Sequence, residues 1–343
     1  MHKEIELWQF IADRLQQNQA VVLLVVAESS GSSPGRQGYK MAVGADGELT
    51  VSIGGGVMEV NLVEQSRMIL SDAVTRRHGD AGREKENEEE ILQAAADGFT
   101  SFLKSQVHQK NTTSPSGMIC SGRQTVIFRK LSPADLPAIY TVVTALSDSE
   151  QKTITISNDT IRIDENTIDS DFAFEKQSDT EFTFRERLGH KNDLYIIGGG
   201  HCALALSELM SKMDFYIRLY DDRPELNTLD KNRFAHEKYT IDSYENIADS
   251  VPSGQNVYVV VMTLGYKSDA VVIRQLSGKD FRYFGVLGSK AKMATLFREL
   301  KTEGIDATRL GKIHTPIGLA INSHTPEEIA VSIAAEIISV KNS

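Results

Sequence analysis

Residues 193–203 read DLYIIGGGHCA, and residues 221–224 read DDRP. The first stretch is a short apolar run that turns on three glycines into a helical pattern, so it predicts a buried strand, a turn and a helix. Gly198 permits the tight turn, and Gly200 lets the backbone approach a pyrophosphate. Asp221 follows Gly198 by 221 − 198 = 23 residues, about the spacing at which an acidic residue meets a ribose hydroxyl. These features together predict a dinucleotide-binding unit.

The sequence after this unit alternates between strand-like and helix-like patterns. Such alternation predicts a Rossmann-like doubly wound parallel sheet with helices on its faces. In an open sheet of this kind, ligands bind beyond the carboxyl ends of the strands, where the strand order reverses. The expected strands are 194–197, 216–220, 257–262 and 281–287. We expect four strand ends to converge on one crevice: Gly198–His201, Asp221–Arg223, Thr263–Lys267 and Gly288–Lys290.

These strand ends supply the candidate cofactor-binding residues of the C-terminal half: Gly198, Gly200, His201, Asp221, Asp222, Arg223, Gly288, Ser289 and Lys290. Asp221 and Asp222 favour a free ribose hydroxyl, as in NAD, whereas Arg223 leaves a 2′-phosphate conceivable. We interpret His201 either as a phosphate contact or acid, or as a hydrogen-bonding residue at the start of the helix. Lys290 is the stronger of the basic candidates because it lies at the expected crevice.

A second glycine-rich turn lies in the N-terminal half, where Gly54, Gly55 and Gly56 lead into a helical pattern from Val57 to about Leu70. A glycine-rich turn at a helix N-terminus is a candidate anion site, and a flexible turn is the equally weighted alternative. Glu59 suits the helix dipole but would oppose a bound anion. Upstream, Arg36 and Lys40 are basic residues beside a serine-rich loop that could meet an anionic ligand, although exposed basic residues usually have no special role.

The remainder of the N-terminal half predicts a mixed α+β domain. We expect, in order, a helix from Lys3 to about Asn18, a strand covered on both faces over Ala20–Ala27, and a hairpin around Ala45–Gly47. Helical spacing recurs over Ile91–Leu103, within a charged insertion near 76–110. Short alternating strands near 150–185 predict a small antiparallel layer.

A change of pattern at residues 188–192 marks the expected domain boundary. The chain is therefore predicted to be an α/β protein with two domains. The first is the mixed α+β domain at 1–187, and the second is the Rossmann-like domain at 188–343.

The composition is typical of a soluble globular protein, with 343 residues of which 41% are hydrophobic and 24% charged. The net charge of −10 argues against broad binding to nucleic acid or to an anionic membrane, because both require a cationic face. Lys3, Glu4 and Glu6 interrupt any signal-peptide pattern, and no apolar run is long enough to span a membrane. We therefore expect a cytoplasmic protein.

The chain has two cysteines, Cys120 and Cys202, and they form no C-x-x-C pattern. This spacing indicates neither a disulfide framework nor a thiolate zinc site. Cys120 is the better candidate for a functional thiol, with burial as a small hydrophobe as the alternative. Cys202 would lie in the first turn of the helix after Gly200, where the helix field lowers the pKa of a thiol, although packing is its more common role.

Four pieces occur in a specific order: SIGGG at 52–56, DDRP at 221–224, VLGSK at 286–290 and TPEEIA at 325–330. With them, the sequence resembles the XdhC/CoxI family, which comprises accessory factors of xanthine dehydrogenase and related molybdenum hydroxylases. The resemblance covers most of the chain and implies a cofactor chaperone. Members of this family bind the molybdenum cofactor, support its sulfuration by a cysteine desulfurase and pass it to the apo-hydroxylase.

For this chain the resemblance implies the molybdenum cofactor, as molybdopterin or as its cytosine dinucleotide form, and a homodimer. The implied partners are a xanthine-dehydrogenase-type molybdoenzyme and a cysteine desulfurase. Cys120 matches the cysteine of the family's Cys-Gly-Gly piece, which makes it the candidate metal contact. The sequence departs from the family at Val57, where a cysteine is common, and at Leu264 and Tyr266, where many members have histidines.

The alternative function is an NAD(P)-dependent oxidoreductase, or a non-catalytic subunit of a xanthine dehydrogenase complex in purine catabolism. Hydride transfer needs an acid or base and a substrate pocket beside the cofactor. The sequence offers no convincing set of catalytic residues, because Leu264 and Tyr266 stand where ionisable groups would be useful. We therefore expect a chaperone rather than a stand-alone enzyme.

Overall fold

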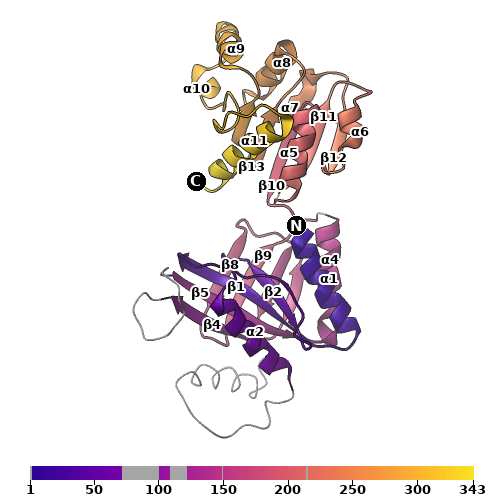
Figure 1. Cartoon of the computed structure of the whole chain (residues 1–343), viewed down its shortest axis with the longest axis vertical. Helices are drawn as coiled ribbons and strands as arrows, with labels where there is room; N and C mark the ends of the chain where they lie inside the picture. The colour runs from indigo at the N-terminus through magenta and orange to yellow at the C-terminus, as the bar shows by residue number, and fades with distance from the viewer. Residues whose placement is uncertain (1, 72–99, 109–121, 149, 214) are drawn as a thin grey trace. The chain divides into compact units, whose positions relative to one another are not determined.

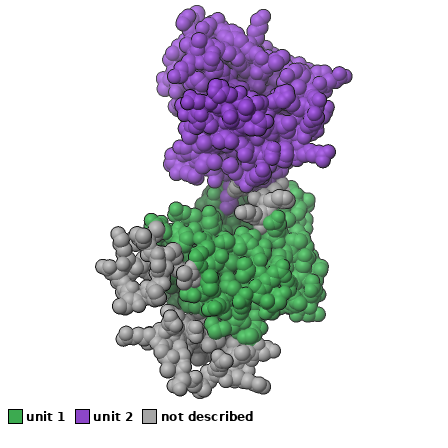
Figure 2. All heavy atoms as spheres, viewed as in Figure 1, with its two compact units in different colours: residues 1–189 green, residues 190–343 purple. Residues whose placement is uncertain are grey.

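The computed structural model describes residues 2–71, 100–108, 122–148, 150–213 and 215–343 (Figure 1). The chain divides into two compact units, Met1–Gly189 and His190–Ser343 (Figure 2). The sequence-based boundary between 187 and 188 lies two residues from this division. Cys120 and most of the expected charged insertion near 76–110 lie outside the described residues.

The first unit is organised around a five-stranded antiparallel sheet with the strand order β3-β2-β1-β5-β4. Its strands are β1 (Val21–Gly31), β2 (Lys40–Gly44), β3 (Leu49–Val51), β4 (Ser101–His108) and β5 (Gly122–Leu131). Residues 21–27 of β1 are fully buried. Successive side chains of a strand point to opposite faces, so the sheet must be covered on both sides.

Four helical segments belong to this unit: α1 (His2–Gln16), α2 (Val57–Leu70), η2 (Pro133–Asp135) and α4 (Leu136–Ser147). Val21, Leu23 and Val25 pack in one core with side chains of α1 and α4. Val22 and Leu24 pack in a second core with side chains of α2. The expected first helix, hairpin and doubly covered strand are thus confirmed.

The expected helix over Ile91–Leu103 is wrong at its C-terminal end. Ser101, Phe102 and Leu103 lie in β4, and Phe102 pairs with Phe128 of β5. Phe102 and Leu103 belong to different cores on the two faces of the sheet, as neighbouring strand residues must. The expected insertion near 76–110 therefore includes a strand of the main sheet.

A second antiparallel sheet has the order β7-β6-β9-β8. Its strands are β6 (Thr153–Ser157), β7 (Ile161–Asp164), β8 (Phe172–Lys176) and β9 (Phe182–Arg187). These strands confirm the small antiparallel layer expected near 150–185.

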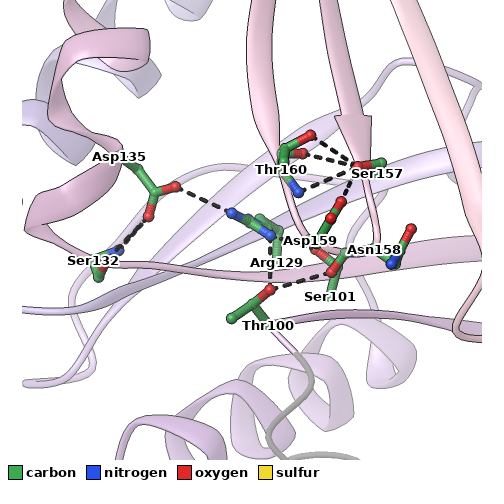
Figure 3. Close-up of polar contacts among 9 residues, drawn as sticks. All are labelled: Thr100, Ser101, Arg129, Ser132, Asp135, Ser157, Asn158, Asp159 and Thr160. Carbon is green, nitrogen blue, oxygen red and sulfur yellow. Dashed lines mark hydrogen bonds and ion pairs between the residues drawn. The ribbon is translucent and has the colours of Figure 1, made fainter.

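A buried arginine helps to join the two sheets (Figure 3). Arg129 of β5 is 3% exposed, and its Nη1 donates to Thr100 Oγ1 at 2.9 Å and to Ser101 Oγ at 3.2 Å. Its Nη2 contacts Asp135 at 3.1 Å. Thr100 in turn donates to the carbonyl of Asn158, in the turn after β6, at 3.2 Å. This network is structural, because every described contact is internal to the fold.

The second unit contains a parallel sheet with the order β12-β11-β10-β13-β14. Its strands are β10 (Asn192–Ile197), β11 (Phe215–Asp221), β12 (Glu237–Thr240), β13 (Gly254–Val261) and β14 (Phe281–Val286). Its helical segments are α5 (His201–Ser211), α6 (Asn227–Lys231), η3 (Tyr244–Asn246), α7 (Ile247–Ser250), α8 (Tyr266–Leu276), α9 (Lys290–Thr302), α10 (Ala307–Leu310) and α11 (Pro326–Lys341).

Helices cover both faces of this sheet (Figure 1). Leu194 and Ile196 of β10 pack with side chains of α5 and α11, whereas Tyr195 and Ile197 pack with side chains of α8 and α9. This arrangement confirms the Rossmann-like doubly wound fold. Strand order reverses between β10 and β13, so the switch point lies at the carboxyl ends of these two strands. The short strand β12 was not expected from the sequence.

Candidate functional site

The turn after β10 has a backbone that only glycine can supply at Gly198. Its φ is 108°, and a Cβ there would lie 2.3 Å from the carbonyl oxygen of Met262. The amide of Gly198 donates to the carbonyl of Tyr220 at 2.8 Å, and that of Met262 donates to the carbonyl of Ile197 at 2.8 Å. The ends of β10, β11 and β13 are therefore drawn together at one edge of the sheet, which we call the carboxyl edge.

Two helices begin at the carboxyl edge without a side-chain cap. α5 starts after Gly200 and α8 after Gly265, and in the described part of the chain no side chain accepts a hydrogen bond from either first turn. Both glycines have ordinary extended backbones, and a Cβ on either would meet nothing within 4 Å. The first turn of a helix presents unpaired N–H donors and a positive field. These two turns are thus suited to receive an anion.

The other long helices of this unit satisfy their first turns internally. The hydroxyl of Ser289 accepts from the amide of Lys292 in α9. Thr325 and Glu328 form a capping box at the start of α11. The uncapped pair therefore coincides with the two helices that follow the switch-point strands β10 and β13.

Asp221, at the end of β11, is fully buried. Its carboxylate accepts from the amides of Gly199 at 2.6 Å and Arg223 at 2.9 Å, and from Nε and Nη2 of Arg223 at 2.8 and 2.7 Å. These donors lower the pKa of Asp221 although burial alone would raise it. Since an ionised carboxylate offers about four acceptor sites, Asp221 fixes the turn and Arg223 and is not exposed to a ribose.

The neighbours of Asp221 complete a rigid turn. Thr228 donates its hydroxyl to the carbonyl of Gly199 at 2.5 Å, so both polar groups of Gly199 are held from within the fold. Asp222 is exposed. The side chain of Arg223 is 31% exposed, so its guanidinium is both anchored by Asp221 and accessible at the carboxyl edge.

A second buried carboxylate lies behind the end of β13. Asp269 is 1% exposed and accepts from the hydroxyl of Thr263 at 2.6 Å and from Nζ of Lys292 at 2.7 Å. Sequence reasoning did not select Lys292. The available signal was weak, because Lys292 lies in the first turn of α9, 23 residues after Asp269, and only the fold brings the two together.

The remaining candidate residues at this edge have different roles. His201 is exposed at the start of α5, and Lys290 is exposed at the start of α9. Ser289 caps α9, and a Cβ on Gly288 would lie 2.9 Å from Met293 Sδ. Of this set, His201 and Lys290 are accessible, while Gly288 and Ser289 shape the start of α9.

The N-terminal glycine turn is already occupied by a carboxylate of the protein. Gly54, Gly55 and Gly56 all have positive φ angles. Oε2 of Glu59 accepts from the amides of Ile53 and Gly55, each at 3.0 Å, and from the hydroxyl of Ser52 at 2.6 Å. The carboxylate of Glu59 therefore takes the amide donors of this turn and would repel an anion there.

Lys40 is a structural residue rather than an anion contact. Its Nζ pairs with Glu186 at 2.7 Å and with Glu4 at 2.8 Å, and its side chain is 5% exposed. Burial would lower the pKa of Lys40, but the two carboxylates reverse this effect and raise it. The interpretation of Lys40 as an exposed basic residue is thus wrong.

Cys202 lies in the first turn of α5 and is half-buried. Burial, with a smaller contribution from Glu327, raises the pKa of its thiol, so the lowered pKa expected from the helix field is wrong. Among the residues that the structure describes, no three His, Cys, Asp or Glu side chains are placed to hold a metal ion. Within the same described residues, no helix combines the length and the apolarity that a membrane span requires.

Comparison with known proteins places both units in one family. The family model for the XdhC Rossmann domain matches residues 194–337, which contain the carboxyl edge. The model for the XdhC and CoxI family matches residues 14–79, which contain the N-terminal glycine turn.

Two curated relatives match part of the chain. The uncharacterised protein YqeB of Escherichia coli (strain K12) is 26% identical over 45% of this chain and 28% of its own length. A probable subunit of xanthine dehydrogenase from Bacillus subtilis (strain 168) is 28% identical over 46% of this chain and 46% of its own length. The aligned part is thus less than half of each relative.

The crystal structure of a xanthine dehydrogenase from Bacillus halodurans shares the fold, with a TM-score of 0.66. It covers 99% of this chain and 96% of its own, at 20% sequence identity. The shared architecture and the two family models agree, and the chain belongs to the XdhC and CoxI family.

Proposed function

We propose that this chain is an accessory factor of a xanthine-dehydrogenase-type molybdenum hydroxylase, and that its carboxyl edge binds the phosphate-bearing part of the molybdenum cofactor. Family membership and the relative named as a probable component of xanthine dehydrogenase support a role in that system. The observation that carries the proposal is the pair of uncapped helix starts at Gly200 and Gly265, on either side of the switch point.

The residues present fit a phosphate or pyrophosphate. The open space at Gly200 and Gly265 allows an oxygen to approach the backbone amides of α5 and α8. Arg223, held by Asp221, supplies a partly exposed guanidinium of the kind that binds phosphate. Lys290 adds an accessible positive charge at the start of α9.

The chain would act on the bound cofactor by holding it. When bound, the molybdenum cofactor carries the metal centre that a molybdenum hydroxylase needs. The amides of α5 and α8 would bind its phosphates, and the internal bonds of Gly199 and Asp221 would keep the turn preformed. We extend the proposal to sulfuration by a cysteine desulfurase and to a homodimer, as the family resemblance suggests, with Cys120 as the thiol beside the metal.

The alternative of an NAD(P)-dependent oxidoreductase is less well supported. It requires an acidic residue at the end of β11 to meet the ribose, but Asp221 is fully buried and accepts four hydrogen bonds from the protein. Asp222 is exposed and is the remaining acid at this strand end. No observation at the carboxyl edge favours hydride transfer over simple phosphate binding.

Substitution at Gly200 tests the proposal with little risk to the fold, because its backbone is extended and its Cβ position is open. Gly200→Asp supplies a good helix cap and places a negative charge where the phosphate would bind. Gly200→Asn has the same shape and capping ability without the charge. The full chain and both variants are purified anaerobically from cells that make the molybdenum cofactor, and molybdenum and pterin are quantified.

We expect the wild type to retain molybdenum and pterin in equal amounts, and Gly200→Asp to lose both. Gly200→Asn should retain more of the cofactor than Gly200→Asp does, because it lacks the repulsive charge. Equal cofactor content in all three proteins would place binding elsewhere. Bound NAD without molybdenum or pterin in the wild type would favour the oxidoreductase instead.

A further inference from the structure

A cavity of about 380 Å³ lies at the opposite end of the parallel sheet from the carboxyl edge. It is lined by residues at the start of β13 and β14, at the end of α8, in α10 and directly after α10. Gln255 and Phe281 mark the two strand starts. The cavity is therefore separate from the proposed cofactor site.

The cavity is positively charged within an acidic protein. Lys279, Arg309 and Lys312 line it, with Asp280 as the carboxylate among its lining residues. Three cations and one carboxylate leave 3 − 1 = 2 positive charges, whereas the whole chain carries −10. Arg282 also lines the cavity, and its Nη2 donates to the carbonyl of Val340 and to the main-chain oxygen of Ser343; counting it as well raises the sum to 4 − 1 = 3.

Two of the three cations are fixed by neutral partners. Nζ of Lys279 donates to the carbonyls of Ala248 and Val251, each at 2.5 Å. Nη1 of Arg309 donates to the carbonyls of Ser277 and Lys279 at 3.2 and 3.4 Å. These carbonyls hold the side chains in place but do not neutralise them. An ammonium has three N–H donors and a guanidinium five, so both groups keep donors for a ligand.

The carboxylate at the cavity offsets only part of this charge. Asp280 lies 3.7 Å from Nη1 of Arg309, and its side chain is 70% exposed. An exposed pair of this kind is weak and is screened by salt. Lys312 is exposed, and among the described residues no ion pair involves it.

The remaining wall is aromatic and apolar. Phe281 and Phe284 both line the cavity and are only partly buried. Their rings lie 5.6 Å apart, edge to face, at 81°. Leu276 and Ile313 extend this surface. Small-molecule sites combine such apolar walls with a few placed polar groups and have volumes of about 300–1,000 Å³, a range that includes this cavity.

We propose that this cavity binds a small molecule that carries a phosphate group and an aromatic ring, the class to which nucleoside monophosphates belong. The cations at Lys279, Arg309 and Lys312 receive the phosphate, and the wall of Phe281 and Phe284 receives the ring. Guanidinium and ammonium groups are the usual phosphate ligands. The site does not depend on the proposed cofactor role, because the two lie at opposite ends of the strands.

Calorimetric titration of the full chain with AMP, adenosine and inorganic phosphate tests this proposal. AMP should bind more tightly than either adenosine or phosphate, and its affinity should fall as salt is raised because the contact is electrostatic. Binding of AMP no tighter than that of phosphate would overturn the role of the aromatic wall. Displacement of AMP by an oligoglutamate peptide at lower concentration would instead identify an acidic-peptide surface and overturn the small-molecule proposal.

Two variants and one matched control locate the site. Arg309→Gln combined with Lys312→Gln should weaken AMP binding at least tenfold, and Lys312→Glu alone should weaken it in the same direction. Lys212→Gln removes an exposed lysine just after α5, outside both proposed sites, and should leave AMP affinity unchanged. Unchanged affinity in both cavity variants, or an equal loss in Lys212→Gln, would overturn the assignment. A thermal midpoint for each variant shows that the chain is folded.

Discussion

Asp221→Asn is predicted to loosen the glycine turn at the carboxyl edge while leaving the first unit untouched. The carboxylate of Asp221 is fully buried and accepts four hydrogen bonds, from the amides of Gly199 and Arg223 and from the guanidinium of Arg223. Asparagine has nearly the same shape but replaces one acceptor oxygen with an NH₂ group. That group would face N–H donors and could not accept from them.

The size of the expected loss in stability follows from the hydrogen bonds that Asp221→Asn removes. The remaining carbonyl oxygen can keep two of the four donors, so 4 − 2 = 2 hydrogen bonds disappear. A hydrogen bond to a charged group contributes about 1.5–3 kcal/mol, and breaking a buried ion pair costs about 3–5 kcal/mol. Because the side chain of Arg223 is 31% exposed and can be rehydrated, we expect a loss near the lower limit, about 3 kcal/mol.

Hydrogen exchange of the Gly199 and Arg223 amides measures this loss, since the two amides donate to different oxygens of Asp221 and asparagine keeps only one of them. A loss of about 3 kcal/mol corresponds to exchange more than a hundredfold faster, because about 1.4 kcal/mol is a factor of ten. Trp8 is the only tryptophan and lies in the core of the first unit. Its fluorescence during urea unfolding should therefore be the same in the wild type and the variant.

The direction of the pKa shift of Asp221 determines how its contribution to stability changes with pH. The pKa of Asp221 is lowered in the folded protein, so its contribution is present above the unfolded value of about 3.9 and is lost as the pH falls through the folded value. The difference between wild type and Asp221→Asn should shrink below about pH 4. Asp222→Asn is the matched control, because Asp222 is exposed. Unchanged exchange at both the Gly199 and the Arg223 amide, or an equal effect of Asp222→Asn, would refute the reasoning.

Three further predictions concern other buried or capping charges. Lys40→Met removes the ammonium that pairs at 2.7 Å with Glu186, whose side chain is 3% exposed. Loss of this buried pair should destabilise the first unit by about 3–5 kcal/mol, and an unchanged urea midpoint of Trp8 fluorescence would contradict this. The raised pKa of Lys40 keeps that contribution intact at neutral pH, and it should decline only above about pH 10.4. Glu59→Gln removes the carboxylate that accepts hydrogen bonds from the amides of the N-terminal glycine turn and should speed hydrogen exchange of those amides roughly tenfold. Exchange at the wild-type rate would show that the carboxylate does not hold the turn. Lys292→Met removes the cation that pairs with Asp269, which is 1% exposed, and should lower the thermal midpoint of the second unit. Adding Asp269→Asn should recover part of this loss, and a double variant less stable than the single one would refute the pairing.

The architecture of the second unit could be predicted from the sequence because its signals are local. The apolar runs of β10 and β13 indicate strands buried on both faces, and the glycines after β10 fix the turn. β12 was missed because its four residues, Glu237–Thr240, are largely exposed and carry no apolar period. Its position is set by backbone pairing with β11, which single-sequence patterns do not report.

The error at Phe102 and Leu103 has a similar cause. A short apolar stretch fits a helical period as well as an extended strand. Backbone pairing with β5 selects the strand over the helix, and Phe102 stacks on its partner Phe128 with ring centroids 5.0 Å apart. Such pairing is a long-range contact and is invisible to local spacing.

The candidate site was predictable in its backbone and less so in its side chains. The requirement for glycine at Gly198 and the space at Gly200 follow from the turn itself. The roles of Asp221, Glu59 and Lys292 do not, because each depends on which donors the fold brings within reach. A carboxylate spaced for a ribose can instead serve its own turn, and only the hydrogen bonds distinguish the two.

We propose that this chain supplies the molybdenum cofactor to a xanthine-dehydrogenase-type hydroxylase. The most direct test of this proposal is the activity and molybdenum content of that hydroxylase, produced without the chain, with the wild type, or with Gly200→Asp. We predict an inactive, molybdenum-poor hydroxylase without the chain, full recovery with the wild type, and little recovery with Gly200→Asp. A fully active, molybdenum-replete hydroxylase produced in the absence of the chain would contradict the claim.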